Sequence, residues 1–495
     1  MSQRSLILVT VDCLRADHAG WLGYDKPTTP FLDSLAAESV AFSNAIVAGS
    51  PTYYSFPAIM ASRYPLALGR DVAGLAPGEH TIASALKEYG YATAAFAAAN
   101  PYLSARFGYN NGFDIFDDFG QKKSRETAQK NEIDSPDLLG AFNQLINKLS
   151  HKSKWMGTFY DELYFRYCQN TASRQDSLDE ARPYPTADIV AQKAIAWLMA
   201  NAHRPFFLWL HFMDAHSPYY PSMAAWEAMG HQSFDTEYAR YWNAYWNRSD
   251  VGKRRLARHQ DNVISLYDAG IRWVDMQLGK LVSQLHELQV WNRCIFAITA
   301  DHGEEFLDHG QRYHSPSQTG EELTRVPLLI HVPGESLPKS VHSPYSLMHL
   351  GPTLLDALDV PAPATFRGRS VWSHIKNNQA WEDVAIVENV AGCTNPFYRK
   401  NRLHPRILIV RESRYKMVID FSVPKIQLFD LALDPHEASP LPEESEKSVH
   451  KRLLERASEH IASSMKSRDT ETSFMARLSE LRLECSQSSE QQQSA

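Results

Sequence analysis

Residues 5–12 read SLILVTVD, an apolar run rich in β-branched side chains that ends in the carboxylate of Asp12. Such a run, without polar alternation, is typical of a strand that is buried on both faces. After a polar, turn-prone stretch, residues 28–39 read TTPFLDSLAAES, which predicts a helix that is capped by Thr28 or Thr29 and has Pro30 in its first turn. The chain therefore opens with a buried strand followed by a helix.

This alternation continues along most of the chain. Helices are predicted at residues 81–88, 188–201, 267–288 and 350–358. Strands are predicted at residues 92–98, 205–213, 294–299 and 328–332. Strands that alternate with helices predict an α/β fold with a largely parallel sheet flanked by helices.

Three segments depart from this pattern. Residues 121–182 are polar, charged and aromatic, and we interpret them as an insertion over one face of the sheet. From about residue 381 the chain changes to short apolar runs at 406–410, 415–419 and 426–429 with a helical pattern at 449–466, which predicts a small antiparallel α+β subdomain. We therefore expect an α/β domain over 1–380, a C-terminal subdomain over 381–470, and a tail over 471–495 whose low-complexity end is disordered.

The composition is that of a globular protein. Hydrophobic residues make up 44% of the 495 residues and charged residues 22%, so a chain that is disordered throughout is excluded. The 50 basic and 57 acidic residues give a net charge of −7, which disfavours a nucleic acid or an anionic membrane surface as partner. A small anionic ligand in a buried site is still compatible with this charge.

The cysteines are widely spaced, odd in number and form no C-x-x-C pair; they are Cys13, Cys168, Cys294, Cys393 and Cys485. This usage argues against a disulfide framework or a zinc ribbon and fits a reducing compartment. The N-terminal apolar run is too short for a secretory signal, and the run at 206–213 is too short to span a bilayer. We therefore expect a cytoplasmic protein without a membrane span.

Polar side chains follow three of the predicted strands, at the edge where ligand sites form in parallel α/β sheets. They are Asp12 after the first strand, Asp214 and His216 after the strand at 205–213, and Asp301 and His302 after the strand at 294–299. Gly303 allows another backbone to approach closely there. Carboxylate and imidazole ligands together suit a divalent cation such as zinc or manganese. Taken singly, each residue reads equally well as a helix cap or a hydrogen-bonded loop residue.

Several blocks of sequence follow one another in a fixed order along the chain: VTVDCLRADHAGWLGY (9–24), SPTYYSFPAIMASRYP (50–65), HFMDAHSPYY (211–220), YDAGIRWVDMQLGKLVSQL (267–285), ITADHGEEF (298–306) and LFDLALDPHE (428–437). In this order they resemble the sulfatase family of the alkaline phosphatase superfamily. The resemblance runs from about residue 5 to about residue 440 and leaves 121–182 unmatched. It implies an alkaline-phosphatase-like fold and a metal-dependent hydrolase of sulfate or phosphate esters.

Within the second block, the resemblance implies a nucleophile. Sulfatases usually carry C/S-x-P-S-R-A-A-x-x-T-G-R-Y-P, whose first residue is oxidised to formylglycine. Aligning the terminal RYP at 63–65 places Thr52 at the first position and Phe56 at that of the motif's Arg. Threonine is not a substrate for this oxidation, so Thr52 is expected to attack phosphorus or sulfur itself and form a covalent intermediate. The alternative register starts the motif at Ser55.

The resemblance also implies one divalent metal ion, held by Asp12, Thr52, Asp301 and His302. Many sulfatases have a second carboxylate directly after the first, where this chain has Cys13. This loss of a hard ligand, with His302 where sulfatases often have Asn, favours manganese or zinc over calcium. Two-metal members of the superfamily place Asp and His four residues apart in the middle block, whereas Asp214 and His216 are two apart.

Two histidines are implied to contact the substrate. His216 resembles the substrate-binding His of the D-x-H-x-P block, and His314 lies near where relatives place a Lys or His at the transferring group and leaving oxygen. Either imidazole is a candidate general acid. Asn100 is a candidate contact to a substrate oxygen or a turn former before Pro101, and His309 reads equally well as structural.

We therefore predict a hydrolase of sulfate or phosphate mono- or diesters, a phosphodiesterase included, acting on a small anionic ester. Two other functions stay open. One is a phospho-group transferase related to the phosphoethanolamine transferases, although those relatives usually carry membrane-spanning helices. The other is a non-catalytic binding protein on a sulfatase scaffold, which predicts loss of metal ligands. The aromatic stretch at 238–246 either lines a leaving-group pocket or packs as a helix; the leaving group and oligomeric state are left open.

Overall fold

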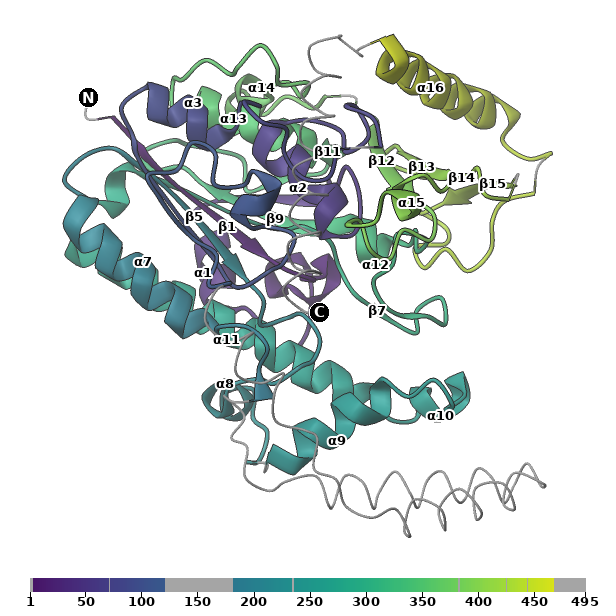
Figure 1. Ribbon diagram of the computed structural model, residues 1–495, viewed down its shortest axis with the longest axis horizontal. Coiled ribbons are helices and arrows are strands. Elements are labelled where there is room, and N and C mark those ends of the chain that lie inside the picture. Colours follow the sequence, from purple (N-terminus) through teal and green to yellow (C-terminus); the bar gives the residue numbers. More distant parts are fainter. Residues whose placement is uncertain are drawn as a thin grey trace, which may run out of the picture.

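The computed structural model describes residues 3–70, 72–120, 181–233, 236–381, 383–423, 425–442 and 444–466. Its centre is a sheet with the strand order β10-β2-β9-β6-β1-β5-β3-β4, in which β11 also pairs with β2 (Figure 1). The strands are β1 (Ser5–Val11), β2 (Val40–Ile46), β3 (Ala92–Ala97), β4 (Ile115–Asp117), β5 (Phe206–Phe212), β6 (Cys294–Ala300), β9 (Arg325–His331), β10 (Ser340–Val341) and β11 (Tyr345–Ser346).

The strands from β6 to β4 in this order run parallel to one another. Every residue of β1, β5 and β6 is buried, because helices cover both faces of the sheet. The strand predicted at 328–332 is present as β9, but it runs antiparallel to both β6 and β2. The sheet is therefore mixed but mostly parallel, which confirms the predicted α/β class.

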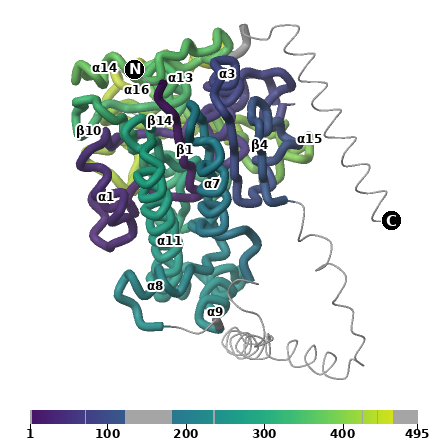
Figure 2. The backbone as a smooth tube through the Cα atoms, turned by 90° about the vertical axis from the view of Figure 1, so that its left-hand side faces the viewer, coloured from purple at the N-terminus to yellow at the C-terminus, as the bar shows by residue number. Residues whose placement is uncertain are grey.

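The helices lie in two layers about this sheet (Figures 1 and 2). One layer contains α1 (Pro30–Ala36), α7 (Ala187–Asn201) and α11 (Gln260–Glu287), and the other contains α2 (Thr52–Ala61), α3 (Ile82–Glu88) and α13 (Leu350–Ala357). The shorter helices are α8 (Met223–Ala228), α9 (Thr236–Trp246), α10 (Lys253–Ala257), α12 (Glu321–Thr324), α14 (Trp372–Lys376) and α15 (Arg399–Arg402). None of the helices in the described ranges is both long and apolar enough to cross a bilayer.

The start of α1 differs in one respect from the prediction. Thr29 is the N-cap residue and Pro30 follows it, but the Thr29 side chain makes no capping bond. The carboxylate of Asp275 in α11 accepts instead from the backbone N–H groups of Phe31 (3.0 Å) and Leu32 (2.9 Å). A tertiary contact therefore satisfies the first turn of α1.

A second, antiparallel sheet contains β12 (Ala385–Val390), β13 (Arg406–Arg411), β14 (Tyr415–Asp420) and β15 (Lys425–Asp430). Because side chains alternate along a strand, Ile407 and Ile409 join the main core while Leu408 and Val410 face α16 (Lys447–Lys466). A two-stranded ribbon, β7 (Glu305–Phe306) and β8 (Arg312–Tyr313), lies between β6 and β9 of the main sheet in sequence. The C-terminal antiparallel unit is thus also confirmed.

Sequence patterns missed β2 and β12, and placed the start of α11 seven residues too late (267 against Gln260). Nearly all of the predicted insertion at 121–182, and the whole predicted tail at 471–495, lie outside the described residues. The boundary between the α/β domain and the C-terminal subdomain, placed between residues 380 and 381, stays a prediction.

Candidate active site

The candidate site lies where the three central strands end. Val11 at the end of β1 is opposite Phe212 of β5 on one side and Ala300 of β6 on the other. The residues that follow these strands therefore meet at one edge of the sheet, which places Asp12 beside Asp301.

Asp12 is fully buried and is contacted by side chains from three elements. Its Oδ2 accepts a 2.7 Å hydrogen bond from Asn100 Nδ2 and lies 3.4 Å from His211 Nε2, while its Oδ1 lies 3.7 Å from His302 Nε2. Burial raises the pKa of Asp12, but the hydrogen bond with His211 and the nearby imidazoles of His216 and His302 outweigh it and hold this pKa well below the usual value. Asp12 is therefore ionised.

His302 is oriented by the backbone. Its Nδ1 donates to the carbonyl of Gly303 at 2.8 Å, which fixes the ring and turns Nε2 toward the cluster. This Nε2 lies 3.1 Å from Thr52 Oγ1 and 3.6 Å from Asp301 Oδ2. Gly303 makes the predicted close approach, because a Cβ there would lie 1.8 Å from the carbonyl oxygen of Glu322.

Asp301 carries a buried oxygen that needs a partner. Its Oδ2 has no hydrogen bond within the described ranges. Burial, and next the charge of Asp12, raise the pKa of Asp301. A divalent cation between the two carboxylates would satisfy this oxygen and remove the repulsion, so the oxygen and nitrogen donors of Asp12, Thr52, Asp301 and His302 fit such an ion.

Thr52 is the first residue of α2, with Pro51 as the N-cap residue. The alternative hydroxyl, Ser55, is buried, and its Oγ has no hydrogen-bond partner in the described part of the chain. Phe56, at the place of the motif's Arg, packs edge-on against His211 with ring centroids 5.3 Å apart. The structure thus brings Thr52, and not Ser55, to His302.

Cys13 lies in the turn directly after β1 with a positive φ of 62°. Its Sγ is 3.2 Å from Asp12 Oδ1 and 3.4 Å from His314 Nδ1. Burial raises the pKa of the Cys13 thiol well above its usual value, and the charges of Glu304, Asp12 and Asp301 add to this. Cys13, which occupies the position of the second carboxylate in many sulfatases, thus belongs to the cluster of side chains around Asp12.

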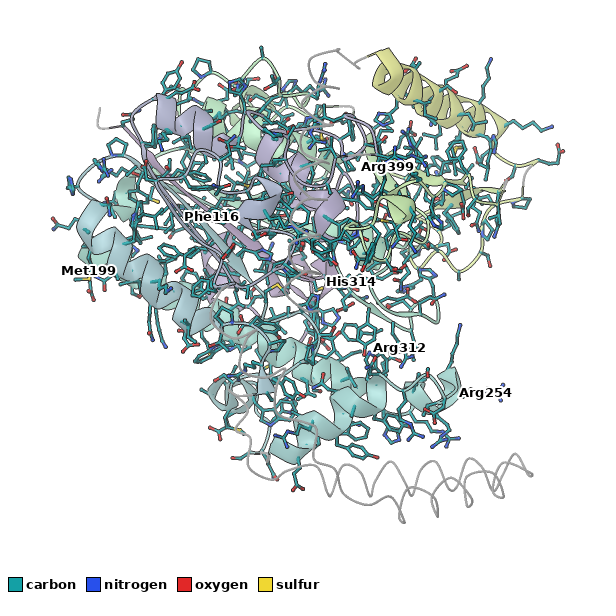
Figure 3. The ribbon with its side chains drawn as sticks, viewed as in Figure 1. Phe116, Met199, Arg254, Arg312, His314 and Arg399 are labelled. Atoms are coloured by element: carbon teal, nitrogen blue, oxygen red, sulfur yellow. The ribbon has the colours of Figure 1, made fainter. Side chains whose placement is uncertain are left out.

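His216 and His314 face each other with ring centroids 5.1 Å apart. His216 Nδ1 donates to the carbonyl of Ser217, and His314 Nδ1 lies 3.1 Å from Glu304 Oε1. Tyr219 donates to the other oxygen of Glu304 at 3.0 Å. In Figure 3, His314 lies near the middle of the molecule, between the main sheet and α9.

A cleft of about 520 Å³ is lined in part by Ser217 and Tyr313, the chain neighbours of these two histidines. Its lining includes Ser217, Tyr220, Arg240, Asn243 and Tyr313. The helix α9 contributes Arg240 and Asn243 to the cleft, whereas its Tyr245 and Trp246 are buried. The aromatic stretch at 238–246 thus packs as a helix and presents polar groups to the cleft.

Three other candidates have different surroundings. Asn100 is bound to Asp12, and its Oδ1 accepts from the backbone of Tyr102 (3.0 Å); a substrate contact stays a prediction. Asp214 accepts from the backbone N–H of Ala187 at the start of α7 (3.2 Å), and burial raises its pKa to about 7. His309 pairs with Glu322 (3.4 Å), away from Asp12.

Sequence reasoning missed His211 and Glu304, which are both fully buried. His211 lies inside β5, where its Nδ1 is 2.9 Å from Thr10 Oγ1. Two signals were available: a histidine within the apolar run FFLWLHFM, and an acidic pair that follows Asp301 and His302 after Gly303.

Comparison with known families gives two matches. The family model described as "Sulfatase" matches residues 4–360. The model described as "N-sulphoglucosamine sulphohydrolase, C-terminal" matches residues 313–463.

Individual relatives agree with these matches. An arylsulfatase of Clostridium perfringens is 25% identical over 88% of this chain and 90% of its own length. Arylsulfatase K of Rattus norvegicus is 28% identical over 50% of this chain, so the chain spans about half (47%) of that relative.

Two solved structures share the fold. One, determined in complex with its substrate D-glucosamine-2-N,6-O-disulfate, has a TM-score of 0.68 at 16% identity and covers 94% of this chain and 99% of its own. The phosphonate monoester hydrolase of Agrobacterium radiobacter has a TM-score of 0.63 at 16% identity, with 94% and 96% covered.

Proposed function

The chain belongs to the sulfatase family of ester hydrolases, and from this premise we propose that it cleaves sulfate or phosphate esters through a covalent intermediate on Thr52, with one divalent ion held by Asp12, Thr52, Asp301 and His302. The observation that carries the proposal is the position of the Thr52 hydroxyl, 3.1 Å from His302 Nε2 and beside the buried carboxylate of Asp301.

The ion would lower the pKa of the Thr52 hydroxyl and would stabilise negative charge on the oxygens of the transferring group. The chain's own residues do the rest. The start of α2 presents Thr52 Oγ1 and favours an oxyanion in front of the helix. The Thr52 hydroxyl gives its proton to solvent, and Oγ1 bonds to sulfur or phosphorus as the ester oxygen departs. His216 or His314 gives that departing oxygen a proton. Water then releases the sulfo or phospho group from Thr52.

The substrate is proposed from the relatives and from the cleft. Arylsulfatases hydrolyse sulfate esters, which makes a sulfate ester the first candidate. The cleft at Ser217 and Tyr313, which follow His216 and precede His314 in the chain, carries Arg240, Asn243 and two tyrosines. This lining suits a polar leaving group better than an aliphatic one. A phosphate ester is the second candidate, since a threonine hydroxyl can attack phosphorus as well as sulfur.

The experiment is a panel of nitrophenyl sulfate, phosphate and phosphodiester assays, with metal analysis of the same preparations. We expect activity on at least one ester, loss of it on chelation, and a sulfo or phospho group on the Thr52 peptide after acid quenching. Thr52→Ala should be inactive and unlabelled. Label on Ser55, or full activity of Thr52→Ala, contradicts the assignment.

The same panel separates the two other functions. Product formed only when an acceptor alcohol is added indicates a transferase. A bound ion without turnover of any ester indicates a binding protein. A cytoplasmic location stays a prediction; Cys13, Cys294 and Cys393 are free thiols in the structure.

A further inference from the structure

Asn389, a residue of β12 in the C-terminal sheet, bridges two segments of the candidate active site. Its Oδ1 accepts a 2.8 Å hydrogen bond from the backbone N–H of Ser50, and its Nδ2 donates to the carbonyl of Pro316 at 3.1 Å. Ser50 lies two residues before Thr52 in the chain. Pro316 lies two residues after His314. One side-chain amide therefore joins the segment of the proposed nucleophile to the segment of a candidate proton donor.

Both hydrogen bonds of Asn389 are shielded from water. Asn389 is 1% exposed, and Ser50 and Pro316 are buried as well. A carboxylate at this position could serve only the Ser50 N–H, and an ammonium group could serve only the Pro316 carbonyl, whereas an amide serves both. Because buried backbone groups need a partner, the bridge requires both ends of this amide.

Two backbone contacts place β12 against the same two segments. The N–H of Glu388 donates to the carbonyl of Ala48 (2.9 Å), and the N–H of Gly392, just past β12, donates to Ser317 Oγ (3.0 Å). At Gly49 a Cβ would lie 2.9 Å from the carbonyl oxygen of Glu388, so only glycine allows this approach. The C-terminal sheet is thus fixed against both segments.

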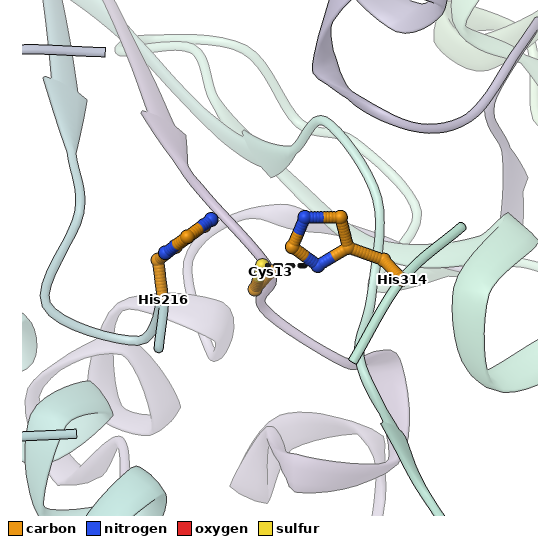
Figure 4. Close-up of side chains that lie close together, drawn as sticks. All are labelled: Cys13, His216 and His314. Atoms are coloured by element: carbon orange, nitrogen blue, oxygen red, sulfur yellow. Dashed lines mark hydrogen bonds between the residues drawn. The ribbon is translucent and has the colours of Figure 1, made fainter. Parts of the chain in front are cut away.

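We propose that Asn389 is a positioning residue for the reaction, which it serves by holding His314 where this side chain can protonate the leaving oxygen. The proposal rests on the proposed function, in which His314 and His216, on either side of Cys13, are the candidate donors (Figure 4). The ring of His314 lies 4.5 Å from that of His302, between centroids, and His302 contacts the Thr52 hydroxyl.

The chemistry needs this separation to be constant. In an in-line displacement the nucleophile and the proton donor act on opposite sides of the transferring group. As the ester bond breaks, its electron pair stays on the leaving oxygen, which takes the proton of His314 and departs as an alcohol or phenol. Thr52 opens α2 and His314 follows β8, so Asn389 fastens two separate elements to one sheet. Without the bridge, His314 can move away while Asp12 and Asp301, at the ends of β1 and β6, stay in place.

The test compares two esters in the full-length enzyme. A nitrophenyl ester has a leaving group that departs without a proton, whereas a phenyl ester has one that needs it. In Asn389→Ala we expect kcat/KM to fall about 10-fold more for the phenyl ester than for the nitrophenyl ester, with the difference in kcat and not in KM. Ser317→Ala removes the exposed contact between Gly392 and the same segment; as the matched control, it should keep the parent's ratio.

A second variant keeps the shape of the side chain. Asn389→Asp retains the acceptor for the Ser50 N–H and, when ionised at alkaline pH, lacks the donor for Pro316. It should show the same selective loss on the phenyl ester, and it decides the question if Asn389→Ala does not fold. Equal losses on both esters, or the same change of ratio in Ser317→Ala, overturn the proposal.

Hydrogen exchange separates this inference from the proposed function. In protein that carries Thr52→Ala, the amides of Ser50 and of residues 314–318 should exchange faster when Asn389→Ala is added. Unchanged exchange overturns the bridge whatever the activity. A parent enzyme that hydrolyses no ester refutes the proposed function, and exchange then decides the bridge. Hydrolysis with faster exchange but a constant ester ratio leaves the function standing and refutes the positioning role.

Discussion

Thr52 Oγ1 lies 3.1 Å from His302 Nε2, across 250 residues of sequence. The first residue of α2 and the residue after Asp301 meet because α2 starts at the carboxyl edge of the sheet where β6 ends. The carbonyl of Gly303 accepts a hydrogen bond from His302 Nδ1, and this directs Nε2 at the hydroxyl. The contact joins the proposed nucleophile to the proposed metal ligands.

A pair of hydroxyl variants in α2 tests this relationship. Thr52→Ser keeps an oxygen at the helix start and should retain measurable ester hydrolysis, whereas Thr52→Ala should lower kcat/KM on the order of 10³-fold or more. Ser55→Ala is the matched control, because this buried hydroxyl forms no hydrogen bond within the described residues. If kcat/KM falls more in Ser55→Ala than in Thr52→Ala, the nucleophile is Ser55, as in the alternative register of the motif.

Part of this site could be predicted from the sequence. Asp12, Asp301 and His302 follow apolar runs that parallel pairing brings to one edge, and pattern alone finds such positions. His211 could not be found in this way, because its surroundings are apolar and its role depends on Thr10 and Asp12 across a strand pair. The direction of β9 was equally out of reach, since a buried apolar run reads the same in parallel and antiparallel sheets.

Glu304 should act as a positioning residue for His314. Glu304→Ala removes the oxygen 3.1 Å from His314 Nδ1, and we expect kcat/KM to fall about 10–100-fold, as for other partners behind a functional histidine. Glu304→Gln keeps an acceptor oxygen and should recover part of the loss. Glu305→Gln is the control, because this neighbour accepts from the backbone of His309 and Gln311 instead. Equal activities of the Ala and Gln variants would rule out an orienting role.

Asp275 should stabilise the fold without affecting chemistry. Asp275→Ala leaves the first-turn N–H groups of Phe31 and Leu32 without their acceptor, so the free energy of unfolding should fall by about 1–3 kcal/mol. Asp261→Ala, an exposed change in the same helix, should stay within about 0.5 kcal/mol of the parent. Urea denaturation followed by circular dichroism measures both. A parent-like midpoint for Asp275→Ala would mean that α1 does not depend on this carboxylate.

His309 gives the fold a pH dependence of predictable sign. Its hydrogen bond with Glu322 raises the pKa of His309 from 6.5 to about 9, so the folded state holds a proton that the unfolded state has lost between these values. The stabilisation is therefore complete below pH 6.5 and disappears as the pH rises through about 9. The difference in thermal midpoint between the parent and His309→Gln should be largest near pH 6 and close to zero near pH 10. A difference that grows with pH would show that the His309–Glu322 pair does not bind the proton in the folded state.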